Sequence, residues 1–317
     1  MQAIVIEHAG GPKALQLKTV PTPKVKAGWT LVKVKGFGIN HSEIYTRKGE
    51  SPSVQFPRIL GIECVGVVAE TSDATALPVG QRVVSFMGGM GRAYDGSYAQ
   101  YCLLPNDQIY PVDTTLTWPE LAAVPETYFT AYGSLLNAHA DAAQSLLVRG
   151  ATSGVGVAAI KLAKALQPSI KVYGSTRNPA KFDQLQAVGC DEPLLEQGGV
   201  LQTDAQVDAI IELVGTSTLQ DSLTHLNAHG YCCVTGGLGD QWTVPEFDPF
   251  ALPSGASLTN FESGAEKNAA AFNAMLELIT KHHIDVAPSR IFDLAHTADA
   301  QALAESKTNF GKIVVIL

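Results

Sequence analysis

The sequence predicts an α/β protein that combines a β-rich N-terminal region with a doubly wound parallel sheet in the middle of the chain. Residues 1–122 hold short β-type runs separated by glycine and proline, whereas helix-type and strand-type segments alternate from about Thr127. Such alternation is typical of a parallel sheet covered by helices. A glycine-containing turn, Gly150–Gly156, lies between an apolar run and an apolar-periodic segment and supports the same fold class.

The strand-type runs of the N-terminal region are recognised by their β-branched and apolar residues. They are Gln2–Glu7, Thr30–Gly36, Cys64–Ala69, Arg82–Phe86 and Gln100–Leu104.

Beyond this region, apolar runs that end in small residues predict further strands, and apolar residues at helical spacing predict helices. The strands are Leu146–Val148, Ile170–Gly174, Val207–Val214, Tyr231–Thr235, Leu258–Phe261 and Lys312–Leu317, and the helices are Pro179–Val188, Thr218–Asn227 and about Lys267–His282.

The turn after Leu146–Val148 is the candidate cofactor site. A small-residue turn lets the backbone approach a pyrophosphate, and the N-terminus of the following helix attracts an anion. The glycines are Gly150, Gly154 and Gly156, which is not the usual G-x-G-x-x-G order, so an ordinary tight turn with a helix cap at Ser153 is the alternative. The predicted contacts are Ala151, Thr152, Ser153, Gly154, Val155 and Gly156.

The end of the next strand indicates which dinucleotide is bound. An enzyme that binds NAD places an acid about 20 residues after the turn, to accept the ribose hydroxyl. No carboxylate occurs between Lys171 and Phe182, and Ser175, Thr176, Arg177 and Lys181 are found there instead. Two cations beside hydroxyl groups suit a 2′-phosphate, so the sequence predicts NADPH. The alternative is that Arg177 and Lys181 are only solvated.

Ligands of open α/β sheets bind at the carboxyl ends of the strands. Further cofactor contacts are therefore expected from residues at the ends of the next three strands. These are Leu213, Val214 and Gly215, then Gly236 and Gly237, and finally Phe261. The alternative for Gly236 and Gly237 is an ordinary turn after a strand.

Composition argues against two classes of partner. The chain has 317 residues and a net charge of −8, which argues against nucleic acid or an anionic membrane as the main partner. We find no long apolar span and no signal peptide, so we expect a cytoplasmic protein. The 5 cysteines are scattered and odd in number, which favours reduced thiols.

Several motifs resemble the medium-chain dehydrogenase/reductase superfamily across almost the whole chain. They are Gly36–Tyr45, Pro57–Val68, Thr130-Ala131-Tyr132, the Gly150–Gly156 turn and Asn309–Val314. The resemblance implies a catalytic GroES-like domain at residues 1–122 and 262–317, and an NADP-binding Rossmann domain at residues 123–261. Within the superfamily the chain is most similar to the zinc-free quinone oxidoreductases (ζ-crystallin-like) and enone reductases.

The positions that hold catalytic zinc in the alcohol dehydrogenases of this superfamily are Asn40 and Ile62 here. Ile is no zinc ligand and Asn is a poor one, whereas a catalytic zinc needs three protein ligands. We therefore expect no metal site.

The resemblance also implies roles for single residues. Asn40 and Tyr45 match polar positions that line the nicotinamide pocket. We expect Tyr45 to donate a hydrogen bond to the developing oxyanion, and Asn40 to position substrate or nicotinamide. The alternative for Tyr45 is a half-buried aromatic residue whose hydroxyl lies in water. Thr130 resembles a residue that contacts the carboxamide, and Asn309 resembles one that folds over the cofactor.

Two classes of function are open at this point. The first is an NADPH-dependent oxidoreductase that reduces quinones, or the double bond of enones and alkenals, by hydride transfer without zinc. The second is a non-enzymatic NADPH-binding protein, either a sensor or a crystallin-like structural protein. The resemblance further implies a homodimer, in which the sheets of two nucleotide domains pair edge to edge.

Overall fold

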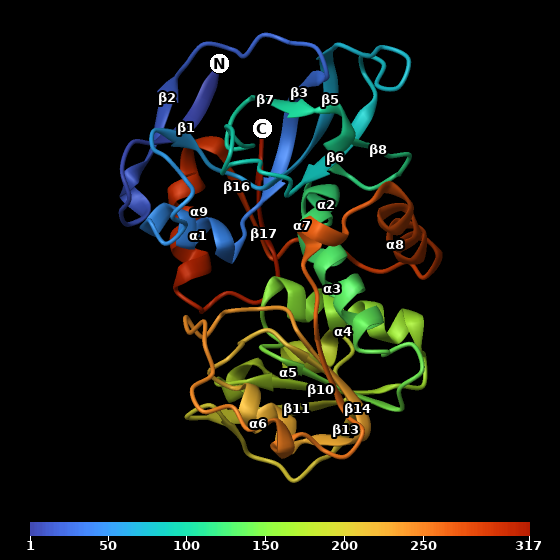
Figure 1. Cartoon of the computed structure of the whole chain (residues 1–317). Coiled ribbons are helices and arrows are strands. Elements are labelled where there is room, and N and C mark those ends of the chain that lie inside the picture. Colours follow the sequence, from blue (N-terminus) through green and yellow to red (C-terminus); the bar gives the residue numbers. More distant parts are fainter. The chain divides into compact units, whose positions relative to one another are not determined.

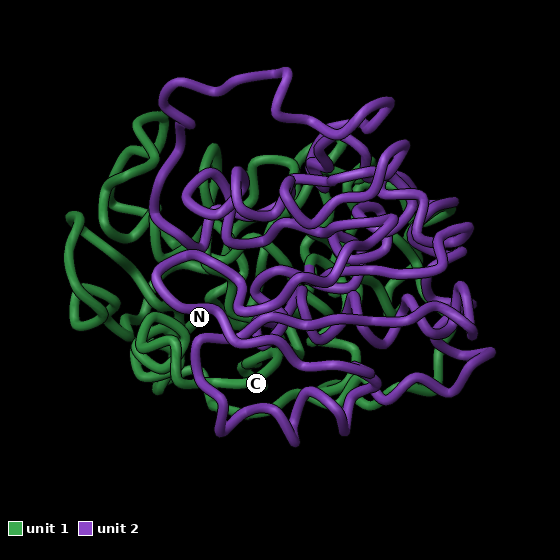
Figure 2. The backbone as a smooth tube through the Cα atoms, turned by 90° about the horizontal axis from the view of Figure 1, so that it is seen from below, with its two compact units in different colours: residues 1–126, 286–317 green, residues 127–285 purple.

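The computed structural model describes all residues from Met1 to Leu317, and the chain forms two compact units (Figure 2). Unit 1 comprises residues 1–126 and 286–317, and unit 2 comprises residues 127–285. The sequence-based division gave residues 262–317 to the first unit, whereas residues 262–285 cluster with unit 2. The reason is that helix α8 (Ala269–Lys281) packs against helix α4 (Gly154–Leu166) of that unit.

Unit 1 contains two β-sheets and three α-helices. The small sheet has the order β2 (Leu15–Thr19), β1 (Gln2–Ile6), β4 (Arg58–Ile59). The large sheet has the order β16 (Arg290–Asp293), β17 (Ile313–Ile316), β3 (Trp29–Gly38), β5 (Glu63–Thr71), β6 (Arg82–Phe86), β8 (Tyr110–Pro111), with β7 (Tyr101–Pro105) also paired to β3. The helices are α1 (His41–Lys48), α2 (Trp118–Ala122) and α9 (Thr297–Glu305).

Unit 2 is built on one seven-stranded sheet, of which β10, β11, β13 and β14 are labelled in Figure 1. Its order is β12 (Val200–Leu201), β11 (Glu192–Gln197), β10 (Lys171–Thr176), β9 (Ser145–Arg149), β13 (Val207–Glu212), β14 (Leu226–Val234), β15 (Ser257–Asn260). All neighbours are parallel except β11 and β12. The predicted fold class, a doubly wound parallel sheet beside a β-rich region, is therefore confirmed.

One of the remaining helices precedes the first strand of unit 2, and the others follow its strands. Helix α3 (Pro125–Asn137) runs from the end of unit 1 into unit 2, and α5 (Phe182–Ala187), α6 (Leu219–Thr224) and α7 (Ser263–Glu266) are short. The predicted helix Thr218–Asn227 was too long, because β14 already begins at Leu226. The hairpin of β11 and β12 was not predicted. Its turn consists of Gly198 and Gly199, which both have positive φ.

All five cysteines are free and buried, which confirms the expectation of reduced thiols. Burial raises the pKa of Cys64 to about 12 and that of Cys190 to about 11. The pKa values of the other three thiols are raised by burial as well. None of the helices has both the length and the apolar character that a membrane crossing requires.

Candidate functional site

The turn between β9 and α4 has the compact geometry that the sequence predicts. Ser153 begins the helix: its hydroxyl accepts the N–H of Gly156 at 3.0 Å and donates to the carbonyl of Gly150 at 2.8 Å. A Cβ atom on Gly156 would lie 2.6 Å from that same carbonyl oxygen, so no larger residue fits. Gly154 and Val155, whose N–H groups have no partner within the helix, are partly exposed and free to face an anion.

The residues after β10 divide into supporting and exposed groups. Ser175 is only 1% exposed, and its hydroxyl accepts the N–H of Gly150 at 3.0 Å. The hydroxyl of Thr176 accepts the N–H of Asn178 at 3.2 Å. Arg177, in contrast, is exposed, and Lys181 is buried beside it. Burial and the charge of Arg177 both lower the pKa of Lys181. The binding of a 2′-phosphate by these two cations stays a prediction.

At the ends of β13 and β14 the two backbones approach each other closely, because glycines occupy this place. A Cβ on Gly236 would lie 2.0 Å from the carbonyl oxygen of Leu213, and Gly215 has a φ of +98°. The buried carboxylate of Glu212 accepts the N–H groups of Val214 at 2.8 Å and Gly215 at 2.9 Å. Those two N–H groups are therefore committed to the protein. Any contact of the Val214–Gly215 turn with a cofactor has to come from other atoms.

A buried arginine, which sequence reasoning missed, supports the same end of the sheet. Arg149, fully buried at the end of β9, forms ion pairs with Glu196 at 2.8 Å and Asp221 at 2.6 Å. It also donates to Ser222, whose hydroxyl donates in turn to Glu212. The cluster thereby connects three strands and α6 beneath the predicted cofactor contacts.

In unit 1, the side chain of Asn40 lies in a network of buried charges. Its amide nitrogen donates to Glu63 at 2.7 Å and to the carbonyl of Gly38 at 3.4 Å, and its amide oxygen accepts the ammonium of Lys312 at 2.8 Å. Lys312 and Glu63 form an ion pair at 2.8 Å, and both side chains are at least nine-tenths buried. Since both amide hydrogens of Asn40 are used, the residue is held in one orientation and has no free donor for a substrate oxygen.

A second buried carboxylate fixes the start of α1, on which Tyr45 lies. Glu43 accepts the N–H groups of Asn40 and Ile62, each at 2.8 Å, and the hydroxyl of Tyr98. Burial raises the pKa of Glu43, and these hydrogen bonds oppose the shift. Tyr45 is half-buried and packs edge-on against the ring of His41, with centroids 5.4 Å apart.

The other predicted residues occupy separate places. Thr130 is partly buried on α3, where its carbonyl accepts the hydroxyl of Ser134 at 2.6 Å. Phe261 packs near Phe129 in unit 2, with ring centroids 5.9 Å apart. In unit 1, the amide of Asn309 is engaged locally: it donates to the carbonyl of Gly311 at 2.7 Å and accepts the hydroxyl of Ser289 at 3.2 Å.

The side chains present do not fit a catalytic zinc. No three His, Cys, Asp or Glu residues are grouped so that they could hold a metal ion. At the two positions considered from the sequence, Asn40 is bonded to Lys312, a cation, and Ile62 is a buried apolar residue. A positive ammonium next to Asn40 further disfavours a second cation there.

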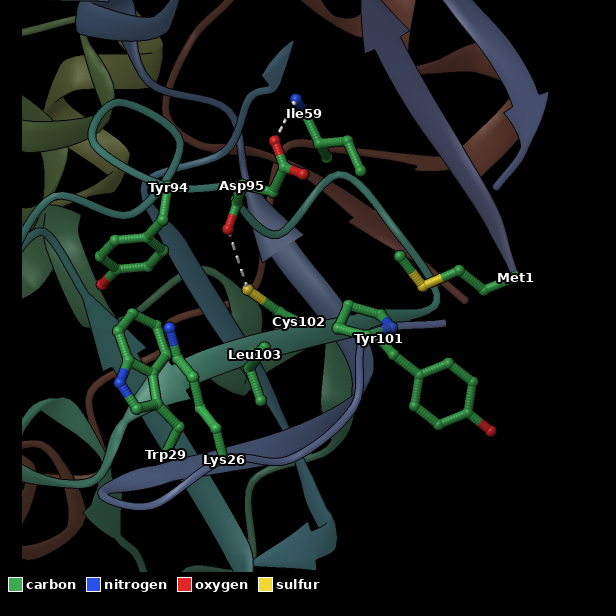
Figure 3. Close-up of a pocket in the computed structure, with 11 residues that line it drawn as sticks. Met1, Lys26, Trp29, Ile59, Tyr94, Asp95, Tyr101, Cys102 and Leu103 are labelled. Carbon is green, nitrogen blue, oxygen red and sulfur yellow. Dashed lines mark hydrogen bonds between the residues drawn. The ribbon is translucent and has the colours of Figure 1, made fainter. Parts of the chain in front are cut away.

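A pocket of about 180 Å³ in unit 1 contains none of the predicted site residues (Figure 3). Tyr94 packs edge-on against Trp29 at 5.2 Å, and the ammonium of Lys26 lies 4.0 Å from the centroid of the Trp29 ring. The carbonyl oxygen of Asp95 accepts the thiol of Cys102 at 3.7 Å. Five of the lining residues are thus engaged with one another, and we assign the pocket no part in the function.

Comparison with known proteins adds independent evidence. Residues 26–114 match the family model "Alcohol dehydrogenase GroES-like domain", and residues 189–315 match "Zinc-binding dehydrogenase". A quinone oxidoreductase of Pongo abelii is 30% identical over 292 residues, which cover 88% of this chain and 87% of that protein.

Two solved structures are similar over the whole chain. The quinone oxidoreductase of Coxiella burnetii has a TM-score of 0.87 and 25% identity, covering 100% of this chain and 99% of that one. A mycobacterial protein solved in complex with NADPH has a TM-score of 0.86 and 24% identity, and covers both chains fully (100%). At that identity, the second likeness concerns the fold alone.

Proposed function

The chain belongs to the quinone oxidoreductase family of medium-chain dehydrogenases/reductases, and from this premise we propose that it is an NADPH-dependent reductase of quinones or other conjugated carbonyls that works without zinc. The observation that carries the cofactor part is the turn of unit 2. Because position 156 is a glycine, the first turn of α4 packs directly against the backbone of Gly150 and Ala151, where a Cβ would lie 2.6–2.7 Å from backbone atoms. A dinucleotide pyrophosphate fits such a turn.

In this proposal the bound NADPH supplies a hydride from its nicotinamide ring. The turn residues Thr152 to Gly156 bind the pyrophosphate, and Arg177 with Lys181 binds the 2′-phosphate. The hydroxyl of Tyr45 donates a hydrogen bond to the substrate oxygen as negative charge develops there. Asn40, whose amide hydrogens are committed, has only a positioning role. The contacts of Thr130 and Asn309 with the cofactor remain predictions.

The proposal is tested by a screen of NADPH oxidation over quinones, cyclic enones and alkenals. Turnover of quinones with NADPH supports the proposed activity, and turnover of alkenals alone assigns the chain to the enone reductases. If no substrate is reduced although NADPH binds, the non-enzymatic alternative holds instead.

Replacing Arg177 with Ala should weaken NADPH binding by roughly 1.5–3 kcal/mol, the range for hydrogen bonds to charged groups. NADH affinity should stay unchanged, because NADH lacks the 2′-phosphate. Binding is measured by the fluorescence of the reduced nicotinamide. Arg290→Ala, at an exposed arginine of unit 1, is the matched control. An equal loss for both cofactors would show that Arg177 does not bind the phosphate.

Replacing Tyr45 with Phe should lower kcat and kcat/KM together, because the lost hydrogen bond forms mainly in the transition state. One oxyanion donor contributes roughly 2.7–4 kcal/mol in a closed site, and we expect less for the half-buried Tyr45. Steady-state kinetics with one quinone and one enone measure the effect, and Tyr101→Phe is the control. An unchanged kcat on every substrate would reject the role.

Elemental analysis of dialysed protein should find well under one zinc per chain, and chelators should leave NADPH oxidation intact. The physical reason is the set of available ligands. Ile62 cannot bind zinc, and the side-chain oxygen of Asn40 already accepts a hydrogen bond from the ammonium of Lys312. One tightly held zinc per chain would contradict this expectation.

We also propose a cytoplasmic homodimer. Strand β15 is one edge of the unit 2 sheet, and Leu258 on it is 39% exposed, so a second copy has an edge to pair with.

A further inference from the structure

We propose that Trp242 is a specificity-determining residue whose indole ring favours planar, fused-ring aromatic quinones over aliphatic enones. The inference rests on the proposed function and extends it to a substrate class. It starts from an unusual observation: Trp242 is 65% exposed, although a side chain of this size and type is normally well buried.

The indole lies directly on a glycine at the end of β14. A Cβ atom on Gly237 would lie 2.9 Å from Cζ3 and 3.0 Å from Cη2 of Trp242. The six-membered part of the indole therefore covers the Gly237 backbone, and much of the rest of the ring faces solvent. A side chain at position 237 would displace the ring, so the glycine and the tryptophan form one arrangement.

Hydrogen bonds fix the segment that carries Trp242, so the exposure of the indole is a property of an anchored segment. Leu238 donates to the carbonyl of Leu213 at 3.2 Å, and Gly239 donates to that of Val214 at 2.8 Å. The hydroxyl of Thr216 donates to the carbonyl of Gln241 at 2.6 Å. Three hydrogen bonds thus attach the segment to the end of β13 and the turn that follows.

Sheet order places this ring at the reacting end of the cofactor. The order changes direction between β9 and β13, and the two halves of a dinucleotide bind on the two sides of such a point. The proposed phosphate clamp, Arg177 with Lys181, follows β10 and marks the adenosine side. Strands β13 to β15 then hold the nicotinamide side, where Trp242 lies. An aromatic ring held in water at a binding edge is suited to stack on another planar ring.

Phe250 provides a matched control in the same connection between β14 and β15. It is 93% exposed, like Trp242 an aromatic residue in water, and lies on a short 3-10 turn, Pro249–Ala251. Phe250 has no contact with the end of β14 that corresponds to the packing of Trp242 on Gly237.

The experiment compares Trp242→Ala, Trp242→Phe and Phe250→Ala with the unaltered protein. We expect Trp242→Ala to raise KM for 1,4-naphthoquinone by about tenfold and KM for trans-2-hexenal by less than about twofold, the size of an aromatic stacking contribution. Trp242→Phe should restore most of the naphthoquinone KM, and Phe250→Ala should change neither. NADPH affinity should be the same in all four proteins.

Three results would overturn the inference: equal changes for both substrates, no change in either KM, or a loss of NADPH affinity, which would place the indole on the cofactor instead. If the unaltered protein reduces no compound of the full quinone, enone and alkenal screen, the proposed function fails. Calorimetry of naphthoquinone binding to the NADP⁺ complex then tests Trp242 alone: a tenfold weaker Kd in Trp242→Ala supports the inference, and an unchanged Kd refutes it.

Discussion

Replacing Lys312 with Met should destabilise unit 1 by about 3–5 kcal/mol, the cost of breaking a buried ion pair by removing one partner. The carboxylate of Glu63 is 1% exposed and would be left without its counter-ion. Glu63 also accepts the N–H of Glu126 at 2.8 Å, at the start of α3, so that the disturbance reaches this helix as well. Urea unfolding followed by the fluorescence of Trp29 and Trp118, both in unit 1, measures the loss.

Lys18→Met is the matched control, because Lys18 and Glu7 form an ion pair at 2.6 Å that is substantially exposed. Such surface pairs contribute about 0–1 kcal/mol, so this variant should unfold almost like the unaltered protein. Adding Glu63→Gln to Lys312→Met should recover part of the loss, since no buried charge then stays unpaired. A Lys312→Met protein as stable as the control variant would disprove the importance of the pair.

Replacing Gly156 with Ala should abolish tight NADPH binding and destabilise unit 2. The new Cβ would meet the carbonyl oxygen of Gly150 at 2.6 Å and two backbone atoms of Ala151 at 2.7 Å, and backbone atoms cannot rotate away as a side chain can. Overpacking of this kind costs about 1–3 kcal/mol. The displaced turn should weaken NADPH binding by at least about tenfold, which corresponds to 1.4 kcal/mol.

Gly11→Ala is the control for this substitution, because Gly11 has φ −71° and a Cβ added to it would meet no atom within 4 Å. Thermal unfolding and NADPH titration of both variants separate the steric effect at position 156 from the general effect of replacing a glycine with alanine. If Gly156→Ala binds NADPH normally, the turn is not the pyrophosphate site.

The parts of the fold that could be predicted from the sequence are those that depend on local pattern. The turn at Gly150–Gly156 was found because strand, small residues and helix follow one another directly, and the predicted parallel sheet needed only the alternation of segments. The β11–β12 hairpin was missed because β12 has only 2 residues and β11 (Glu192–Gln197) contains a proline and three polar residues.

The buried charges were missed for a different reason. Lys312 and Glu63 are 249 positions apart, and Arg149 meets its carboxylates 47 and 72 positions away. No local pattern encodes such a pairing. A signal was nevertheless present, since Glu212 interrupts an apolar run that reads as a buried strand, and Arg149 and Glu63 directly adjoin two other such runs. A charge in such a run needs a partner, although the sequence does not say which one.

The burial of the cysteines bears on how the protein resists modification by electrophilic substrates. Quinones and enones are electrophiles that arylate or alkylate proteins, and the group they attack is the thiolate. Here every thiol is enclosed in the protein, and its raised pKa keeps it protonated at neutral pH. An enzyme of the proposed activity therefore handles reactive compounds without presenting a soft nucleophile to them, and repeated turnover should not inactivate it through its own cysteines.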